Sequence, residues 1–200
     1  MSKVYFTSDT HFGHQNILHF SGKEKLGDHG RCGTNSEEHD EWLIEEINKV
    51  VKKRDILYIL GDVAMGKPGS NSNGSGVGNL NKVKQLHGTK KFILGNHDDM
   101  PIQAYMEIAQ VVRGMDRYKG FWLSHCPMHP NELRGRKNIH GHVHANSITR
   151  KVTPNLRVKE VLDENYVNVC VEANMMRNGT PIVEFSELNQ LVGGYMQRVY

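Results

Sequence analysis

The stretch Ile56-Leu57-Tyr58-Ile59-Leu60-Gly61-Asp62 places five apolar residues directly before a glycine and an aspartate. A short apolar run that ends in this way is typical of a buried strand in a parallel sheet. Short runs of similar character recur at residues 4–6, 92–94, 121–123, 166–171 and 182–185. We expect a strand at each of these places.

Helical patterns lie between the expected strands. Within residues 37–53, Leu43, Ile47, Val50 and Val51 recur at the spacing of one helical face, and Thr34 offers a capping-box start. Further helices are expected over residues 80–87 and 101–110 and from residue 186 onward. Strands interleaved with helices predict a layered α/β fold.

Composition describes an ordinary globular chain of 200 residues with 25 Lys and Arg, 22 Asp and Glu, a net charge of +3 and 12 histidines. Short basic segments are spread along the chain. No apolar run approaches the ~20 residues of a membrane helix. Three widely spaced cysteines suggest neither a disulfide framework nor a disulfide-linked partner, and a cytoplasmic location is expected.

The length predicts a single domain over residues 1–200. Two stretches interrupt its pattern of strands and helices. Residues 19–35 are polar and are expected to form an insertion at the rim of a substrate pocket. Residues 66–79 are rich in Gly, Ser and Asn and are expected to form a flexible loop. The oligomeric state is left open by the sequence.

Polar residues follow almost every apolar run, in the blocks Asp9-Thr10-His11, Gly61-Asp62, Gly95-Asn96-His97-Asp98, Ser124-His125 and Gly141-His142-Val143-His144. In an open α/β sheet the carboxyl ends of the strands line the ligand crevice. These five blocks are therefore expected to meet in one pocket.

Spacing within the blocks suggests a metal site. Asp9 with His11, and His142 with His144, are i, i+2 pairs that would leave an extended chain on the same side. Nitrogen and oxygen donors without a thiolate favour borderline divalent metals. Seven candidate ligands are too many for one tetrahedral ion, so two ions are implied, and a bridging carboxylate would hold them ~3.5 to 4 Å apart.

The five blocks together, in this order, resemble the motifs of the calcineurin-like metallophosphoesterases. The extended block from Ser8 to His14 and the ending from Asn168 to Ile182 are similar to the small bacterial and phage branch of that family. The resemblance implies a four-layer α-β-β-α sandwich. It also implies two divalent ions, with manganese expected first and iron, nickel, zinc and cobalt as alternatives.

The resemblance also implies individual roles. The first metal would be bound by Asp9, His11 and His144, the second by Asn96, His125 and His142, with Asp62 bridging the two. His97 would stabilise or protonate the leaving oxygen, and Asp98 would hold its imidazole in orientation. A histidine kept off the metals can carry a proton to donate.

The expected function is hydrolysis of a phosphodiester by a metal-bridging hydroxide, with an anionic nucleotide or cyclic nucleotide, such as a 2',3'-cyclic one, as substrate. Diester is preferred to monoester because Val63, Ala64 and Met65 stand where an arginine clamp would follow Gly61-Asp62. The alternatives are a phosphomonoesterase or phosphoprotein phosphatase, and a catalytically inactive binding module with the same fold.

Three further residues lie near the blocks. His14 is expected either to touch the substrate phosphate or to cap a helix, and Arg31 either to bind the substrate or to lie solvated in its loop. Cys126 adjoins His125, but alternation along an extended chain would send its side chain to the opposite face. A nucleophilic role is not expected for Cys126.

Overall fold

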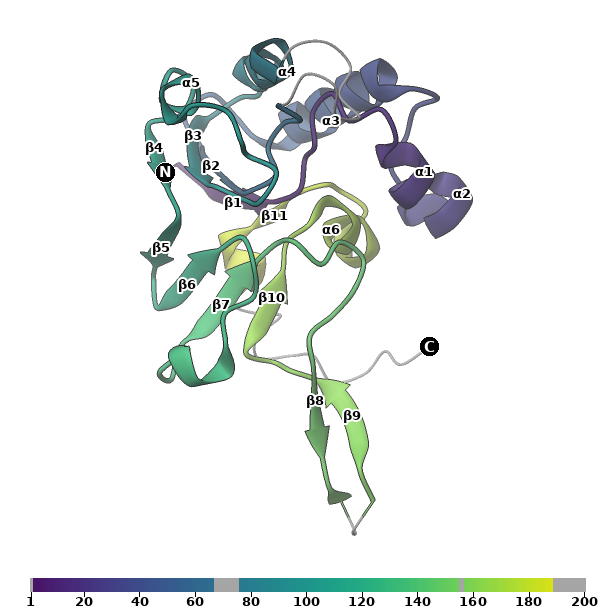
Figure 1. Ribbon diagram of the computed structural model, residues 1–200, viewed down its shortest axis with the longest axis vertical. Coiled ribbons are helices and arrows are strands. Elements are labelled where there is room, and N and C mark those ends of the chain that lie inside the picture. Colours follow the sequence, from purple (N-terminus) through teal and green to yellow (C-terminus); the bar gives the residue numbers. More distant parts are fainter. Residues whose placement is uncertain (1, 67–75, 155–156, 189–200) are drawn as a thin grey trace.

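The computed structural model describes residues 2–66, 76–154 and 157–188. Two mixed sheets form its centre (Figure 1). The first has the order β11 (Val183–Glu184), β1 (Val4–Thr7), β2 (Ile56–Leu60), β3 (Thr89–Ile93) and β4 (Val111–Arg113). The second has the order β10 (Tyr166–Asn168), β7 (Lys137–His140), β6 (Phe121–Ser124) and β5 (Met115–Tyr118).

In both sheets, all strands but one edge strand run parallel to their neighbours. Neighbouring strands from β1 to β4 are parallel, and so are β6, β7 and β10. Only the edge strands β11 and β5 run antiparallel to their neighbours. The carboxyl ends of β1, β2 and β3 therefore share one edge of their sheet, as do those of β6 and β7.

The two sheets pack face to face because side chains alternate along each strand. On β1, Phe6 faces the second sheet and is buried with Leu123 and Ile139. Its neighbour Tyr5 faces the other way and packs with the helices, against Leu43 and Ile47. One apolar layer thus lies between the sheets, and a second lies between the first sheet and its helices.

The helices that complete this second layer are α3 (Ser36–Val50), α4 (Gly76–Lys82), α5 (Ile102–Met106) and α6 (Val171–Asn178). Helix α3 begins where Asn35, rather than the expected Thr34, accepts hydrogen bonds from the backbone N–H groups of Glu37 and Glu38. The short helices α1 (Ile17–Ser21) and α2 (Lys23–Leu26) and the turn η1 (Gly27–His29) occupy most of the polar insertion 19–35.

The remaining elements are η2 (Val83–Gln85), η3 (Pro130–Glu132) and a separate ribbon of β8 (Thr149–Val152) and β9 (Lys159–Leu162). Of the flexible loop expected over 66–79, residues 67–75 lie outside the described residues, and helix α4 begins at Gly76. The strand expected over 166–171 ends at Asn168, and helix α6 starts at Val171. The ribbon, α6, β4 and β5 were not predicted from the sequence.

The described residues form three of the four expected layers, namely one layer of helices and the two sheets. The outer face of the second sheet carries η3, whose neighbour Leu133 accepts a hydrogen bond from Trp122, and a cavity discussed below. None of the helices described here combines the length and apolar character needed to cross a membrane. The three cysteines are free thiols.

Candidate metal centre

The expected site blocks occupy loops that leave the carboxyl ends of β1, β2, β3, β6 and β7. The first two loops run side by side, because the N–H of Asp9 donates to the carbonyl of Gly61 and that of His11 donates to the carbonyl of Asp62, at 3.0 and 2.9 Å. These two bonds fix the loop after β1 against the loop after β2. Side-chain contacts bring the other three blocks to the same place, as the sequence predicted.

Left-handed backbone is concentrated in these loops. Among the described residues, seven non-glycine residues have a positive φ, and five of them are Asp9, His11, Asp62, His142 and His144, with φ between 49° and 71°. Such conformations cost of order 1–3 kcal/mol each and persist where the surroundings enforce them. The i, i+2 pairs therefore converge through turns, and not through the strand alternation expected from the sequence.

The first group of candidate ligands is built around one oxygen of Asp9. Its Oδ1 lies 3.8 Å from His11 Nε2 and 3.7 Å from His144 Nε2. The other oxygen, Oδ2, accepts hydrogen bonds from the Ser8 hydroxyl and from the His142 N–H, at 2.6 and 2.9 Å. Asp9 Oδ1 and His11 Nε2 are buried and have no hydrogen-bond partner among the described residues. Unpaired buried acceptors of this kind are what a metal ion would satisfy.

The second group is built around His125 Nε2. This atom lies 2.9 Å from Asn96 Oδ1, 3.2 Å from His142 Nδ1 and 3.5 Å from Asp62 Oδ2. Its other ring nitrogen, Nδ1, is 2.8 Å from the carbonyl of Leu60 and donates to it. When the ring is neutral, that bond keeps the proton on Nδ1 and leaves the lone pair on Nε2, the form in which an imidazole binds a metal.

Asp62 lies between the two groups. Its Oδ2 is 3.7 Å from His11 Nε2 in the first group and 3.5 Å from His125 Nε2 in the second. Burial alone would raise the pKa of Asp62, but the hydrogen bond and charge of His125 lower it to about 2. In turn, Asp62 and Asp9 overcome the effect of burial and raise the pKa of His125 to about 9. The carboxylate is thus ionised across the physiological range.

Two glycines allow this close approach. A Cβ at Gly95 would meet the carboxylate and backbone N of Asp62, and a Cβ at Gly141 would meet Ser8 and the Asp9 carboxylate. Any larger residue there would push a candidate ligand out of place. The glycines that precede Asn96 and His142 in the sequence are therefore required by packing against the carboxylates.

Asp98 has a different role from the one expected. Its carboxylate accepts hydrogen bonds from the backbone N–H groups of Asp62, Val63 and Gly95, at 2.8 to 2.9 Å. Burial raises the pKa of Asp98 to about 6 despite these bonds. The carboxylate therefore ties the loop after β2 to the loop after β3, and its hydrogen bonds do not orient the His97 imidazole.

His97 and His14 both lie beside His11. The His97 ring is exposed and its centre is 5.8 Å from that of His11, while its backbone N–H donates to Asp62 Oδ1 at 2.9 Å. The half-buried His14 ring is 5.6 Å from His11, and its Nδ1 accepts the N–H of Asn16. Burial lowers the pKa of His14, so the ring is neutral at pH 7.

Arg31 lies inside the protein and not at a surface that a substrate could reach. Its side chain is fully buried, and its Nε donates to Glu172 Oε1 at 2.8 Å. Its other nitrogens donate to the backbone carbonyls of Asp9 and Thr10. The substrate contact expected of Arg31 does not fit this placement; Arg31 holds the loop of the first candidate ligands from beneath.

Glu172 is a site residue that the sequence did not indicate. Its Oε1 lies 3.2 Å from Nδ1 of His144 as well as accepting from Arg31. Burial would raise the pKa of Glu172, but Arg31 and His144 hold it well below its usual range. A carboxylate on Nδ1 fixes the histidine tautomer and leaves Nε2 free as a ligand. No local pattern connects Glu172, on a helix missed by the sequence, with His144.

The buried network continues away from the site. Arg31 contacts His39 Nε2 at 3.1 Å, His39 Nδ1 lies 3.1 Å from Asp40 Oδ1, and Asp40 Oδ2 accepts from Lys82 at 2.7 Å. Helix α3 supplies His39 and Asp40, and helix α4 supplies Lys82. A chain of polar contacts thus joins two helices to His144 through Arg31 and Glu172.

Cys126 is not on the opposite face. Its Sγ belongs to a group with nitrogens of His125 and His142 whose atoms all lie within 4.8 Å of one another. Strand β6 ends at Ser124, so the alternation assumed from the sequence has already stopped. Burial raises the pKa of the Cys126 thiol, which keeps it protonated and disfavours a nucleophilic role, as expected.

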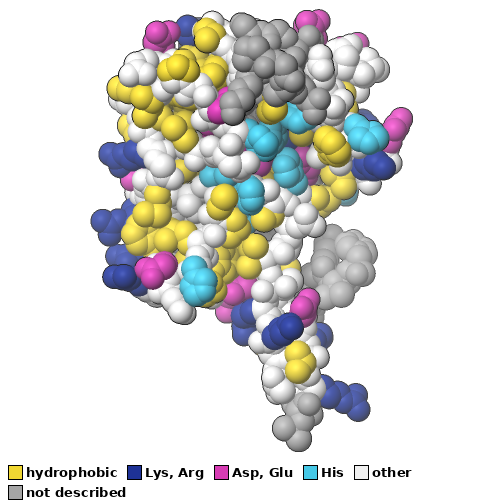
Figure 2. Space-filling model, viewed as in Figure 1, with side chains coloured by type: hydrophobic (Ala, Val, Ile, Leu, Met, Phe, Trp, Pro, Cys, Tyr) yellow, Lys and Arg dark blue, Asp and Glu magenta, His cyan; other side chains and the backbone are white. Residues whose placement is uncertain are grey.

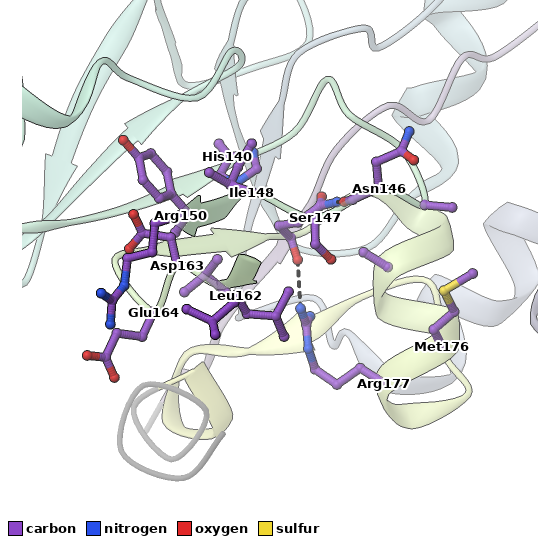
Figure 3. A pocket seen from close by; sticks show the side chains of 16 residues that line it. His140, Asn146, Ser147, Ile148, Arg150, Leu162, Asp163, Glu164, Met176 and Arg177 are labelled. Atoms are coloured by element: carbon purple, nitrogen blue, oxygen red, sulfur yellow. Dashed lines mark hydrogen bonds between the residues drawn. The ribbon is translucent and has the colours of Figure 1, made fainter. Parts of the chain in front are cut away.

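A separate cavity of about 390 Å³ adjoins the segment that follows His144 (Figure 3). It is lined by the outer face of the second sheet, by α6 and by the base of the ribbon, through residues such as His140, Ile148 and Arg177. Burial lowers the pKa of His140 to about 4. None of the seven candidate ligands lines this cavity.

One of the solved structures that match this chain does so over nearly its whole length. The crystal structure of the protein of unknown function AQ665 from Aquifex aeolicus has 25% sequence identity and a TM-score of 0.63, and the match covers 96% of this chain and all of that one. The nuclease MPE from Pseudomonas putida has 21% identity and a TM-score of 0.43, over 70% of this chain and 61% of that one.

Sequence comparison gives relatives of similar length, while no family model matches the chain. Uncharacterized protein MJ1445 from Methanocaldococcus jannaschii is 33% identical over 180 residues, which cover 86% of this chain and 83% of that protein. The Gene 66 protein of Mycobacterium phage D29 is 30% identical over 193 residues, covering 82% and 89%. The chain belongs to the family that includes MJ1445 and this phage protein.

Proposed function

We propose that the chain is a metal-dependent phosphoesterase that hydrolyses a phosphodiester. The observation that carries the proposal is the position of Asp62, whose Oδ2 faces His11 Nε2 at 3.7 Å and His125 Nε2 at 3.5 Å. One ionised carboxylate between two groups of nitrogen and oxygen donors is the arrangement expected of a dinuclear centre.

The donor set fits two divalent ions of the manganese class. We assign Asp9, His11 and His144 to the first ion and Asn96, His125 and His142 to the second, with Asp62 shared. The unpaired buried atoms Asp9 Oδ1 and His11 Nε2 support this assignment. Two bound cations would neutralise charge on the phosphoryl group and make water a nucleophile near neutral pH.

His97 is assigned to the leaving group. Its exposed ring lies beside the first group of ligands without belonging to either group, and Asp62 Oδ1 fixes its backbone N–H at 2.9 Å. From that position a protonated imidazole can donate to the departing oxygen. The neutral His14 ring, which also lies beside His11, is assigned to a phosphate oxygen, with Nε2 as the donor.

A diester is favoured over a monoester because a monoester carries an additional negative charge. Arg31 is buried against Glu172 and backbone carbonyls, so it cannot clamp that charge. Val63 and Ala64, which follow Asp62, are apolar and buried. Cyclic nucleotides, including 2',3'-cyclic ones, and short nucleic-acid fragments are the diesters to screen first.

The test compares bis-p-nitrophenyl phosphate with p-nitrophenyl phosphate in manganese buffer, together with metal analysis of the purified protein. We expect two ions per chain and faster turnover of the diester. Asp62→Asn should lose metal and activity, while Asp163→Asn, on the loop before β10, should lose neither. Faster monoester turnover would overturn the choice of substrate. A protein that binds no manganese and hydrolyses neither compound would overturn the enzyme assignment and favour a binding module.

A further inference from the structure

The ribbon of β8 and β9 projects from the body of the protein (Figure 1) and, among the described strands, joins neither large sheet. Its strands are antiparallel, with Thr149 opposite Leu162 and Val152 opposite Lys159. Only Val152 and Val161 in these strands are half-buried, and the other side chains are exposed. A lone two-stranded hairpin gains little stability from packing. Because most of its side chains are exposed, they are free to contact another molecule.

The ribbon concentrates the positive charge of the chain. Residues 149–162 contain four cations, Arg150, Lys151, Arg157 and Lys159, and one acid, Glu160, a net charge of +3. The whole chain also has a net charge of +3, so the remaining residues sum to zero. The positive charge that looked dispersed in the sequence is thus carried, in net terms, by one projecting element.

One face of the ribbon carries cations without an acid. Arg150 is opposite Val161, and Val152 is opposite Lys159, so Arg150 and Lys159 are diagonal neighbours on the same face. Lys151 is opposite Glu160 on the other face. Two more acids, Asp163 and Glu164, follow β9 where the ribbon meets the body. Within the described part of the chain, no ion pair involves any of the four cations.

The ribbon is joined directly to the candidate metal centre. Four residues, 145–148, separate His144 from the start of β8 at Thr149. Fully extended, five residue steps reach about 18 Å, and the three steps to Val152 add about 10 Å. Figure 2 shows the histidine cluster and the basic side chains of the ribbon on the same side of the molecule.

We propose that this ribbon binds the phosphate backbone of a nucleic-acid strand whose phosphodiester lies at the metal centre. The proposal rests on the proposed function for the identity of that diester. Exposed Lys and Arg side chains on a projecting ribbon match the regular negative charge of a polynucleotide, whereas a mononucleotide could not reach from the centre to the ribbon. The contour length of about 28 Å is the largest separation possible between His144 and Val152, and at the 3.4 Å spacing of a duplex strand it corresponds to at most roughly eight nucleotides.

The test measures binding by the metal-free protein, so that it does not depend on catalysis. Fluorescence anisotropy would follow a labelled 20-nucleotide single-stranded DNA and a labelled trinucleotide at several salt concentrations. The ribbon variant is Arg150→Gln/Lys151→Gln/Lys159→Gln. The matched control is Lys52→Gln/Lys53→Gln/Arg54→Gln, which removes the same charge from an exposed turn after α3. Circular dichroism and light scattering would check the fold and the mass of each variant.

We expect the ribbon variant to bind the 20-mer at least tenfold more weakly, with a salt slope smaller by roughly 2, because each lost phosphate contact contributes ~0.7 for a single strand. The control should bind like the wild type, and the trinucleotide should bind weakly to all three proteins. Equal binding by wild type and ribbon variant would overturn the proposal, as would equal losses in both variants. The proposal would also be overturned if the wild type were a dimer and the ribbon variant a monomer, because the ribbon would then be an interface between copies. If 20-mer binding depends on the ribbon but no diester is hydrolysed, this inference stands and the proposed function fails.

Discussion

Arg31→Met tests whether the buried network beneath the candidate centre acts as one unit. The substitution keeps the apolar stem of the side chain and removes its charge. It leaves the Glu172 carboxylate, 2.8 Å from Arg31 Nε in the wild type, buried without its cation. Removing one partner of a buried ion pair costs about 3–5 kcal/mol.

Further losses add to this figure. The carbonyls of Asp9 and Thr10 each lose a donor from Arg31, at about 1 kcal/mol apiece. Glu172→Gln should cost about 3–5 kcal/mol, because it leaves the guanidinium unpaired. The double variant should lose clearly less free energy of unfolding than the sum of the two single variants, because it leaves no buried charge of the pair unpaired. We therefore expect a coupling energy of about 3 kcal/mol between the two positions.

The assay is urea unfolding of the metal-free protein followed by circular dichroism, with thermal melts in parallel. Each single variant should lower the melting temperature by roughly 10 °C. Arg134→Met is the matched control, because Arg134 forms an exposed ion pair with Glu132 at 3.3 Å, and its loss should have no measurable effect. Additive costs for Arg31→Met and Glu172→Gln would refute the reasoning, and so would a cost no larger than that of the control.

Three other substitutions give independent checks. His97→Ala in the manganese-loaded protein should reduce turnover about 10²- to 10⁴-fold for a diester whose leaving group is a poorly acidic alcohol. The loss should be smaller for bis-p-nitrophenyl phosphate, because its leaving group needs less proton donation. Equal losses on both substrates would contradict the assignment of His97. Gly95→Ala should weaken manganese affinity, measured by calorimetry, because its Cβ would displace the Asp62 carboxylate; unchanged affinity would show that the loops can adjust. His140 has a folded pKa of about 4 against 6.5 for the free side chain, so the unfolded chain binds the extra proton and stability falls as the pH drops from 6.5 toward 4. His140→Gln should reduce that fall by about 3 kcal/mol in urea titrations of the metal-free protein, and an identical pH profile would rule out His140 as a cause.

Much of the first sheet could be predicted from the sequence because its signals are local. The run from Ile56 to Leu60 matches β2 at both ends, and the expected helix over 37–53 is α3, shifted by one residue at its start and three at its end. Elements without a local apolar period were missed. The ribbon of β8 and β9 is largely exposed, and Val171 belongs to a helix although it continues an apolar run.

The sequence by itself determined which residue types stand at the ends of the strands, and hence the candidate ligand set. Chain order placed Asp9 and Asp62 after β1 and β2, whose parallel pairing brings their carboxyl ends to one edge of the first sheet, and it placed His125 after β6 of the second sheet. Only the tertiary structure decided how those side chains are held. The left-handed turns, the buried contact of Arg31 with Glu172 and the bonds of Asp98 to backbone N–H groups join residues far apart in the chain. Such contacts depend on how the loops pack in three dimensions, and no spacing within the sequence records that packing.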